Sequence, residues 1–262
     1  MTFVRLYVRQ WIAPILFFAG FLLLWEALIR IFEIPRVVLP SPVTIGSALV
    51  RMRHELALGL MRTLSASMSG LLASTTIGVL TACVFSQSRL IRVTLYPYAV
   101  LLQTIPIVAI APIILVSLGR GFFSIALIAC LISLFPVITN TTTGLMQVDP
   151  ELLDLFRLYR ATRWQVLTRL QIPTAMPYLI SGIRIAAGAS IVGAIVGEFF
   201  VGSSQPGLGA IIQQKDTFTL PDLYAAVFVS ALLGTSMFGV ISVLGEFVLR
   251  RWFGMSLIQQ KS

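Results

Sequence analysis

An uncharged stretch in the middle of the chain decides the fold. Residues 121–148 read GFFSIALIACLISLFPVITNTTTGLMQV, which is 28 residues between Arg120 and Asp149 without an Asp, Glu, Lys or Arg. A helix needs about 20 apolar residues to cross the hydrocarbon core of a bilayer. The run is continuous rather than alternating, which favours a helix over a membrane strand. The stretch therefore predicts a membrane-spanning helix.

Similar stretches lie on both sides of this one. Three more have no charged residue, namely 63–88, 93–119 and 223–245. Two are less clean: residues 11–32 include Glu26 and Arg30, and residues 179–201 include Arg184 and Glu198. The sequence therefore predicts an all-α, polytopic membrane protein with six transmembrane helices.

The composition of the whole chain agrees with this fold class. Of 262 residues, 57% are hydrophobic and 11% are charged, whereas roughly a quarter of the residues in soluble domains are charged. A soluble enzyme, a disordered chain and a secreted disulfide scaffold are all disfavoured. Arg5 and Arg9 precede the first apolar segment as in a signal peptide. The length of that segment and the lack of a small-x-small cleavage site favour a retained helix.

The distribution of basic residues predicts the orientation. With six spans, both termini lie on one side, which carries twelve Lys and Arg residues against seven on the other. The positive-inside rule then places both termini and the loop 142–178 in the cytoplasm. The net charge of +9 reflects this topology. No basic cluster with interleaved aromatic residues indicates a nucleic-acid-binding face.

The sequence offers no catalytic or metal-binding cluster. Cys83 and Cys130 lie inside apolar spans, where a free cysteine usually packs as a small apolar residue. A single histidine, His54, cannot build a haem or zinc site. We therefore expect no disulfide, no metal ion, no cofactor and no catalytic residue on this chain.

The loop 142–178 carries the densest local signals. Asp149 suits a helix N-cap, Pro150 suits the first helical position, and Glu151 suits the first turn. One face of this helix is apolar, with Leu152, Leu155, Phe156 and Tyr159. Thr162 and Gln165 predict a capping box that starts a second helix after a break near Arg160, and Pro173 is expected to end it. Such a loop suits either the lipid interface or a groove on a cytoplasmic protein, and the residues leave both open.

Residues 154–173 resemble the Glu-Ala-Ala loop of ABC-importer permeases. The family pattern is Glu-Ala-Ala, three residues, Gly, nine residues and Ile-x-Leu-Pro. Here these positions hold Asp154-Leu155-Phe156, Arg160 and Leu170-Gln-Ile-Pro173. The resemblance extends over about residues 39–250, through the stretches 39–42, 103–106, 177–188, 197–199 and 207–209. By these motifs, the chain looks like the permeases for nitrate, sulfonates, taurine and thiamine precursors.

The resemblance implies a type I ABC-importer permease fold in a bacterial inner membrane. It implies a translocation path for a small solute, either an anion such as nitrate, a sulfonate or taurine, or a vitamin precursor such as a pyrimidine. The implied partners are two ATPase subunits, a second permease copy or paralogue, and an external solute-binding protein. The chain has no G-x-x-x-x-G-K-[ST] loop, so ATP and Mg²⁺ are expected on the ATPase. The alternative is an ATP-independent channel or secondary transporter.

The resemblance also assigns the residues of an ATPase-coupling loop, which are Asp154, Leu155, Phe156, Arg157, Tyr159, Arg160, Ala161, Thr162 and Arg163. Two positions depart from the family pattern. Leu155-Phe156 replaces a small Ala-Ala pair, and Arg160 replaces a glycine. If that glycine position has a left-handed backbone, arginine there costs about 1 kcal/mol. Alternatively, the first helix runs one residue further.

The translocation path is expected along the third and fifth spans. Pro97, Pro106 and Pro112 interrupt the third span and would expose backbone groups beside Gln103 and Thr104, whereas Ser133 belongs to a weaker set in the fourth span. Small residues recur along the fifth span, with Gly193 and Gly197 among them. They suit either packing within one subunit or a dimer seam that lines the path, and the resemblance favours the seam. Glu198 either lines the path or locks to a basic loop residue.

Three regions are expected along the chain. Residues 1–62 form an N-terminal transmembrane helix and an external segment, and residues 63–250 form the permease core with the loop 142–178. Residues 251–262 form a cytoplasmic tail. The external segment begins with a turn at Leu39-Pro-Ser-Pro42 and continues as a surface helix over 44–60. It faces the same side as the loop 202–222, and the two segments either receive a solute-binding protein or simply cap the helices.

Overall fold

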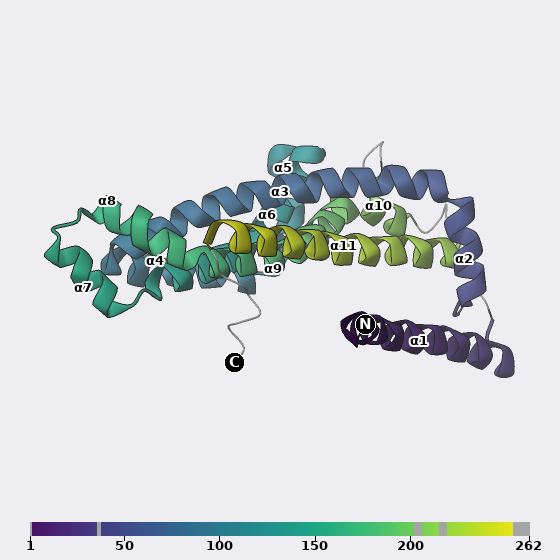
Figure 1. Cartoon of the computed structure of the whole chain (residues 1–262). Coiled ribbons are helices and arrows are strands. Elements are labelled where there is room, and N and C mark those ends of the chain that lie inside the picture. Colours follow the sequence, from purple (N-terminus) through teal and green to yellow (C-terminus); the bar gives the residue numbers. More distant parts are fainter. Residues whose placement is uncertain (1, 36–37, 202–205, 215–218, 254–262) are drawn as a thin grey trace.

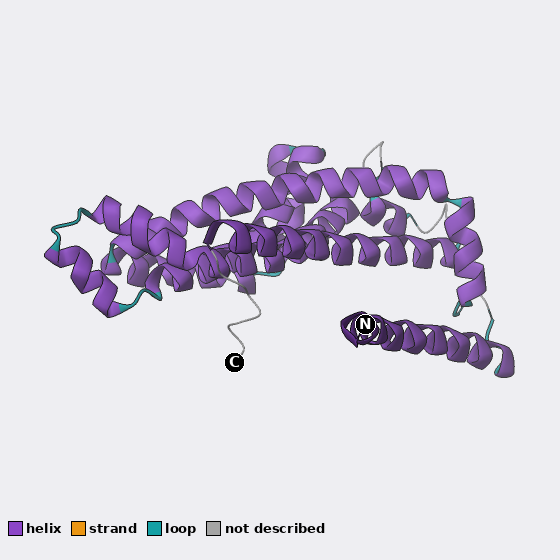
Figure 2. Cartoon of the chain, viewed as in Figure 1, coloured by secondary structure: helices purple, strands orange, loops and turns teal. Residues whose placement is uncertain are grey.

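The computed structural model describes the chain except residues 1, 36–37, 202–205, 215–218 and 254–262. Most of the predicted tail 251–262, and loop residues such as Lys215, therefore lie outside the described residues. The described part is helical and has no strand (Figure 2). Its elements are α1 (Thr2–Ile31), α2 (Pro42–Arg51), α3 (Arg53–Gln87), α4 (Arg89–Thr104), α5 (Ile107–Leu118), α6 (Phe122–Met146), α7 (Pro150–Leu158), α8 (Arg163–Val166), η1 (Leu167–Gln171), α9 (Ile172–Val201), α10 (Leu208–Gln213) and α11 (Leu220–Phe253).

The helices form an elongated bundle with α6 and α9 at its centre (Figure 1). These two helices are antiparallel, since Gly144 of α6 meets Tyr178 while Gly197 of α9 meets Ile125. α3 packs against both, α11 packs mainly against α9, and α4 packs against α3 and α6. α7 and α8 lie at one end of the bundle, and α2 and α10 lie at the other (Figure 1). α1 meets the bundle beside α2 and α11, where Trp25 packs against Tyr224, and α5 projects from the side of the bundle (Figure 1).

Small buried residues allow the central helices to approach closely. Ala129 of α6 and Ala186 and Ala194 of α9 have no exposed surface, and neither do the polar residues Ser74 and Ser133. Helix association in a bilayer depends on such close van der Waals contact, because lipid tails are as apolar as the side chains they would replace. The interior is therefore built from alanine, glycine and serine more than from large side chains.

Four helices are long and apolar enough to cross a membrane, namely Arg53–Gln87, Phe122–Met146, Arg163–Phe200 and Leu220–Arg251. They correspond to the second, fourth, fifth and sixth predicted spans. The first predicted span, 11–32, lies within the 30-residue helix α1 except for its last residue. Large apolar side chains face outward over the bundle, up to 89% exposed at Val116. A surface of this kind suits lipid rather than water.

The third predicted span, 93–119, is not one helix. It is divided into α4 and the 12-residue α5, with the break at Ile105-Pro106. Pro106 has no N–H to continue the helix and pushes Ile105 into an extended backbone. Pro97 and Pro112, by contrast, lie inside helices. The predicted interruption of the helix beside Gln103 and Thr104 is confirmed, whereas Pro97 and Pro112 do not interrupt the helices that contain them.

The expectation that Pro173 ends the second loop helix is wrong. Helical structure runs without a break from Arg163 to Phe200 and includes Pro173. A π-helical segment, Leu167–Gln171, ends two residues before the proline, and the Ile172 N–H donates to the Leu167 carbonyl. The wider π turn holds one extra residue, so the helix can absorb a proline that an α-helical turn would reject.

The predicted surface helix over 44–60 is divided at Met52. Ser41 caps the N-terminus of α2 through its side chain, and α2 ends at Arg51. Residues 53–60 belong to the long helix α3 instead. The side chains of Ile45 and Met52 are buried, so the predicted apolar face does pack inward. The predicted turn at Leu39-Pro-Ser-Pro42 is a bend at Leu39, followed by an extended Ser41, and Pro42 is already the first residue of α2.

Candidate functional site

The two-helix loop projects from one end of the bundle (Figure 1). The Asp149 side chain accepts a hydrogen bond from the Glu151 N–H at 2.9 Å and begins α7. The Thr162 N–H donates to the Gln165 side chain at 2.8 Å, and the Gln165 N–H donates to the Thr162 hydroxyl oxygen at 3.2 Å. This reciprocal pair is the predicted capping box of α8. Both helix starts and the break between them are therefore confirmed.

Arg160 ends α7 in a left-handed backbone conformation with a φ of 52°. The Arg160 N–H donates to the Arg157 carbonyl, and the Ala161 N–H donates to the Phe156 carbonyl. This pair of bonds is the Schellman pattern, in which glycine usually holds the position that Arg160 occupies. The helix therefore does not run one residue further, and arginine at this position costs about 1 kcal/mol or more.

The apolar face of α7 is uncovered. No residue of α7 is buried. Leu158 and Tyr159 are 81% and 80% exposed, and Trp164 at the start of α8 is 71% exposed. Asp154 and Arg157 form an exposed ion pair at 2.8 Å beside them. Apolar side chains gathered at the tip of the molecule, outside the spanning helices, indicate a docking surface.

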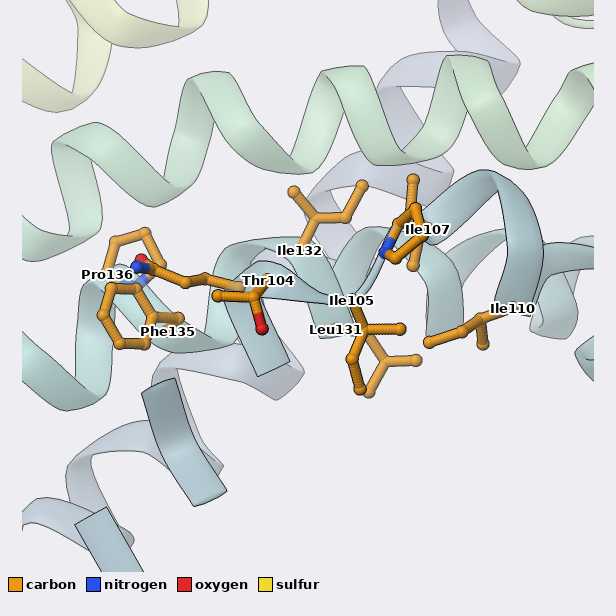
Figure 3. A pocket seen from close by; sticks show the side chains of 10 residues that line it. Thr104, Ile105, Ile107, Ile110, Leu131, Ile132, Phe135 and Pro136 are labelled. Carbon is orange, nitrogen blue, oxygen red and sulfur yellow. The ribbon is translucent and has the colours of Figure 1, made fainter. Parts of the chain in front are cut away.

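A groove of about 390 Å³ lies where α4 ends and α5 begins, against the middle of α6 (Figure 3). Gln103 and Thr104 are exposed and supply its polar side chains. The rest of the lining is apolar and consists of Ile105, Pro106, Ile107, Ile110, Leu131, Ile132, Phe135 and Pro136. The polar pair predicted beside the helix break therefore lies in a groove within the membrane-spanning part of the bundle.

Three other predicted path residues lie between helices. Ser133 is fully buried, with its hydroxyl 2.8 Å from the Ser74 hydroxyl of α3 and 2.7 Å from the Ala129 carbonyl oxygen. A Cβ added at Gly193 would lie 2.7 Å from the Ala129 Cα, and one at Gly197 would lie 3.3 Å from the Ile125 Cα. These residues pack α9 and α3 against α6 of the same chain, and in this structure they do not face the groove.

Glu198 is 3% exposed near the far end of α9 and holds a loop in place. The Thr63 hydroxyl donates to its carboxylate, with distances of 2.9 and 3.1 Å to the two oxygens, and the Gly209 N–H donates to it at 2.7 Å. The Thr63 oxygen also accepts from the Leu208 N–H at 2.9 Å. We call Thr63, Glu198, Leu208 and Gly209 the latch. Glu198 is thus a lock, as one of the two interpretations held, but its partners are a threonine and a backbone amide rather than a basic side chain.

Further contacts fasten the same end of the bundle. Arg62 donates to the Pro206 carbonyl at 3.1 Å, beside the latch. Arg51 of α2 forms an ion pair with Asp222, which also accepts from the Thr219 N–H and hydroxyl at 2.9 and 2.8 Å. The segment 39–62 and the described part of the loop 202–222 therefore lie on one side, as predicted.

Comparison with known protein families identifies the family of this chain. Residues 74–251 match the family described as binding-protein-dependent transport system inner membrane component. The chain belongs to this family. It is a permease subunit of an ABC importer and a multi-pass protein of the inner membrane.

Two curated permeases are similar over most of their length. The permease is 32% identical over 245 residues to the formylaminopyrimidine transport permease protein ThiX of Halalkalibacterium halodurans, covering 93% of this chain and 96% of ThiX. It is 32% identical over 237 residues to the riboflavin transport system permease protein RibX of Chloroflexus aurantiacus, covering 88% and 86%.

A solved structure shares the fold of the permease. A chain of the inward-facing MetNI methionine ABC transporter superposes with a TM-score of 0.63 at 17% identity, covering 76% of the permease and 97% of that chain. The permease therefore has the type I ABC-importer permease fold that the sequence implied.

One charge of the permease lies deeper in the bundle than the sequence indicated. Arg184 was counted with the cytoplasmic basic residues, but it lies between Tyr178 and Gly197, which pack against the two ends of α6. Arg184 therefore lies inside that span, about a third of the way from Tyr178 to Gly197. Its guanidinium carbon is 5.7 Å from the centre of the Phe238 ring on α11. Insertion of an arginine at such a depth costs roughly 3 kcal/mol on translocon scales.

Sequence reasoning missed the partners in the latch and in the Arg51–Asp222 ion pair. Thr63 was only the first residue of an apolar run, and 135 residues separate it from Glu198. The glycine at 207 indicates a close approach of the backbone to another group, since a Cβ there would lie 2.1 Å from the Glu198 carboxylate. A lone Gly-Leu-Gly in a sequence, however, does not identify which residue approaches it. A polar residue at the start of a span and an acid at the end of another are compatible with many pairings.

Proposed function

We propose that this permease forms half of a translocation path and is driven by two ATPase subunits that bind the loop 142–178. The observation that carries this proposal is the uncovered apolar face of α7, at the tip of the bundle and outside the spanning helices. A face of this kind on a short helix suits a groove on another protein. The proposed contact residues are those of the coupling loop, centred on Leu155, Phe156 and Tyr159.

The energy source in this proposal is ATP bound with Mg²⁺ on the ATPase subunits. The chain contributes the docking surface, and both of its termini lie in the cytoplasm with the loop. The basic residues on α7 and at the start of α8 support this orientation, since Arg157, Arg160 and Arg163 are all exposed at that end.

The path itself would need a second permease, either another copy or a paralogue. The groove at Gln103 and Thr104 is open rather than enclosed by this chain, so a second subunit is proposed to complete it. At the latch end, α2 and α10 are proposed to receive an external solute-binding protein. The names of ThiX and RibX support a small solute.

The test is purification of the permease with its ATPase and reconstitution into liposomes. ATP hydrolysis should be stimulated by a solute-loaded binding protein, and Leu155→Asp should abolish this stimulation because it places a charge in the docking face. The matched control is Leu90→Asp at the start of α4, another exposed leucine that lies between Arg89 and Arg92, outside both the coupling loop and the uncharged stretch 93–119. Solute uptake by the permease alone, without ATP, would instead identify an ATP-independent transporter.

A further inference from the structure

We infer that Arg184 forms a binding site for an anionic group of the transported solute, beside the aromatic ring of Phe238. The inference rests on the proposed translocation path, because it needs the open face of α9 to meet the solute. It assigns a role to a charged residue that neither the latch nor the coupling loop uses.

Arg184 has no counter-charge in the part of the chain that the structure describes. Its Nε is buried without a hydrogen-bond partner. The ion pairs among the described residues join Arg30, Arg51, Arg157 and Arg250 to acids, and none includes Arg184. A cation at this depth is unfavourable unless another group compensates its charge. A ligand that brings a negative charge would remove this penalty.

The position of Arg184 connects it with the groove. Gly182 packs against the Pro136 carbonyl, and Pro136 lines the groove. Successive residues of a helix are rotated by about 100° about its axis. Viewed down the axis of α9, Ile185, Val192 and Gly188 therefore lie in this order around the helix between Gly182 and Arg184. Ile185 and Val192 are exposed, and a Cβ added at Gly188 would meet no atom within 4 Å. One open face of α9 therefore runs from the groove to Arg184.

The chemistry of the site favours an anion over a neutral group. A guanidinium presents planar, paired N–H donors that match carboxylate, sulfonate or phosphate oxygens. Phe238 is partly exposed beside it and offers an apolar surface to the rest of the solute. Lipid phosphates lie at the membrane surface, whereas Arg184 lies inside the span, nearly two helical turns beyond Tyr178, so the site favours an anion in the path over a headgroup.

The direct test is ligand-dependent thermal unfolding of the purified permease–ATPase complex. Methanesulfonate is the probe, and methanesulfonamide is its neutral counterpart of nearly the same shape. Methanesulfonate should raise the unfolding midpoint in a saturable way, and methanesulfonamide should not. Arg184→Gln should weaken the methanesulfonate effect about tenfold or more, and Arg184→Lys should weaken it less.

Arg120→Gln is the matched control, because Arg120 is exposed in the turn between α5 and α6 and should leave the response unchanged. Arg184→Gln is expected to fold, since it removes an uncompensated charge from the membrane interior. Equal responses of the wild type and Arg184→Gln, or no response of the wild type to methanesulfonate, would overturn the inference.

A second measurement separates this inference from the proposed function. If the solute that stimulates the ATPase carries no negative charge at pH 7, the Arg184 site is refuted while the importer stands. If no solute-loaded binding protein stimulates the ATPase, the proposed function fails, and methanesulfonate binding still reports on Arg184.

Discussion

The latch can be tested by replacing Thr63 with valine, which has nearly the same shape. Thr63 is fully buried, so the substitution removes the hydroxyl without opening a cavity. The loss of its hydrogen bond to the Glu198 carboxylate costs about 1.5–3 kcal/mol. The Leu208 N–H also loses its acceptor, which costs about 1–3 kcal/mol if that group stays buried. We therefore expect Thr63→Val to lower the free energy of unfolding by about 3 kcal/mol.

The assay is a denaturant titration of the detergent-solubilised permease, followed by circular dichroism. Thr76→Val is the matched control, because Thr76 is exposed on the same helix and bonds only to the Leu72 carbonyl of its own turn. It should change the free energy of unfolding by less than about 0.5 kcal/mol. In a double-mutant cycle with Glu198→Gln, Thr63→Val should show a coupling energy of about 1 kcal/mol or more. A Thr63→Val variant no less stable than the Thr76→Val variant would show that the latch does not hold the loop.

Three further substitutions probe other parts of the structure. Arg160→Gly should raise the free energy of unfolding by about 1 kcal/mol, because glycine has no strain at the left-handed position. Arg157→Gly, inside α7, should lower the free energy of unfolding by a similar amount. Thermal unfolding measures both effects. Leu158→Asp should leave the unfolding midpoint unchanged and reduce co-purification of the ATPase at least severalfold, because this exposed side chain lies in the docking face. Gly193→Ala should destabilise the permease by about 1–3 kcal/mol through a clash with the Ala129 backbone, whereas Gly188→Ala should be neutral or slightly stabilising; equal effects of the two would contradict the packing of α9 on α6.

The features that the sequence predicts well depend on neighbouring residues. Long uncharged runs locate the spans, because crossing the bilayer is a requirement of length and polarity alone. Asp149, Pro150, Thr162 and Gln165 locate the helices of the loop to the residue, because capping bonds form within one turn. The left-handed conformation of Arg160 is one of the two alternatives that the family glycine left open.

The features that the sequence predicts poorly depend on what lies across the bundle. A proline normally ends a helix, and only the π segment before Pro173 lets this one continue. The glycines of α9 form a small stripe whichever neighbour they meet, so the stripe alone does not distinguish α6 of the same chain from a second subunit. Likewise, Glu198 and Arg184 are recognisable as costly charges, but their surroundings come from distant segments.

The unbroken helix from Arg163 to Phe200 has a mechanical consequence. Its 38 residues span about 57 Å and join the capping box of α8 to Glu198 without a break in the helical structure. Where the helix moves as one unit, a tilt imposed at one end becomes a displacement at the other. Tilting it by about 5° about the loop end would carry Glu198 sideways by roughly 5 Å, more than the length of any hydrogen bond that holds it. If an ATPase pushes on the coupling loop, as the proposed function requires, such a tilt would break the bonds of the latch at the opposite end of the bundle.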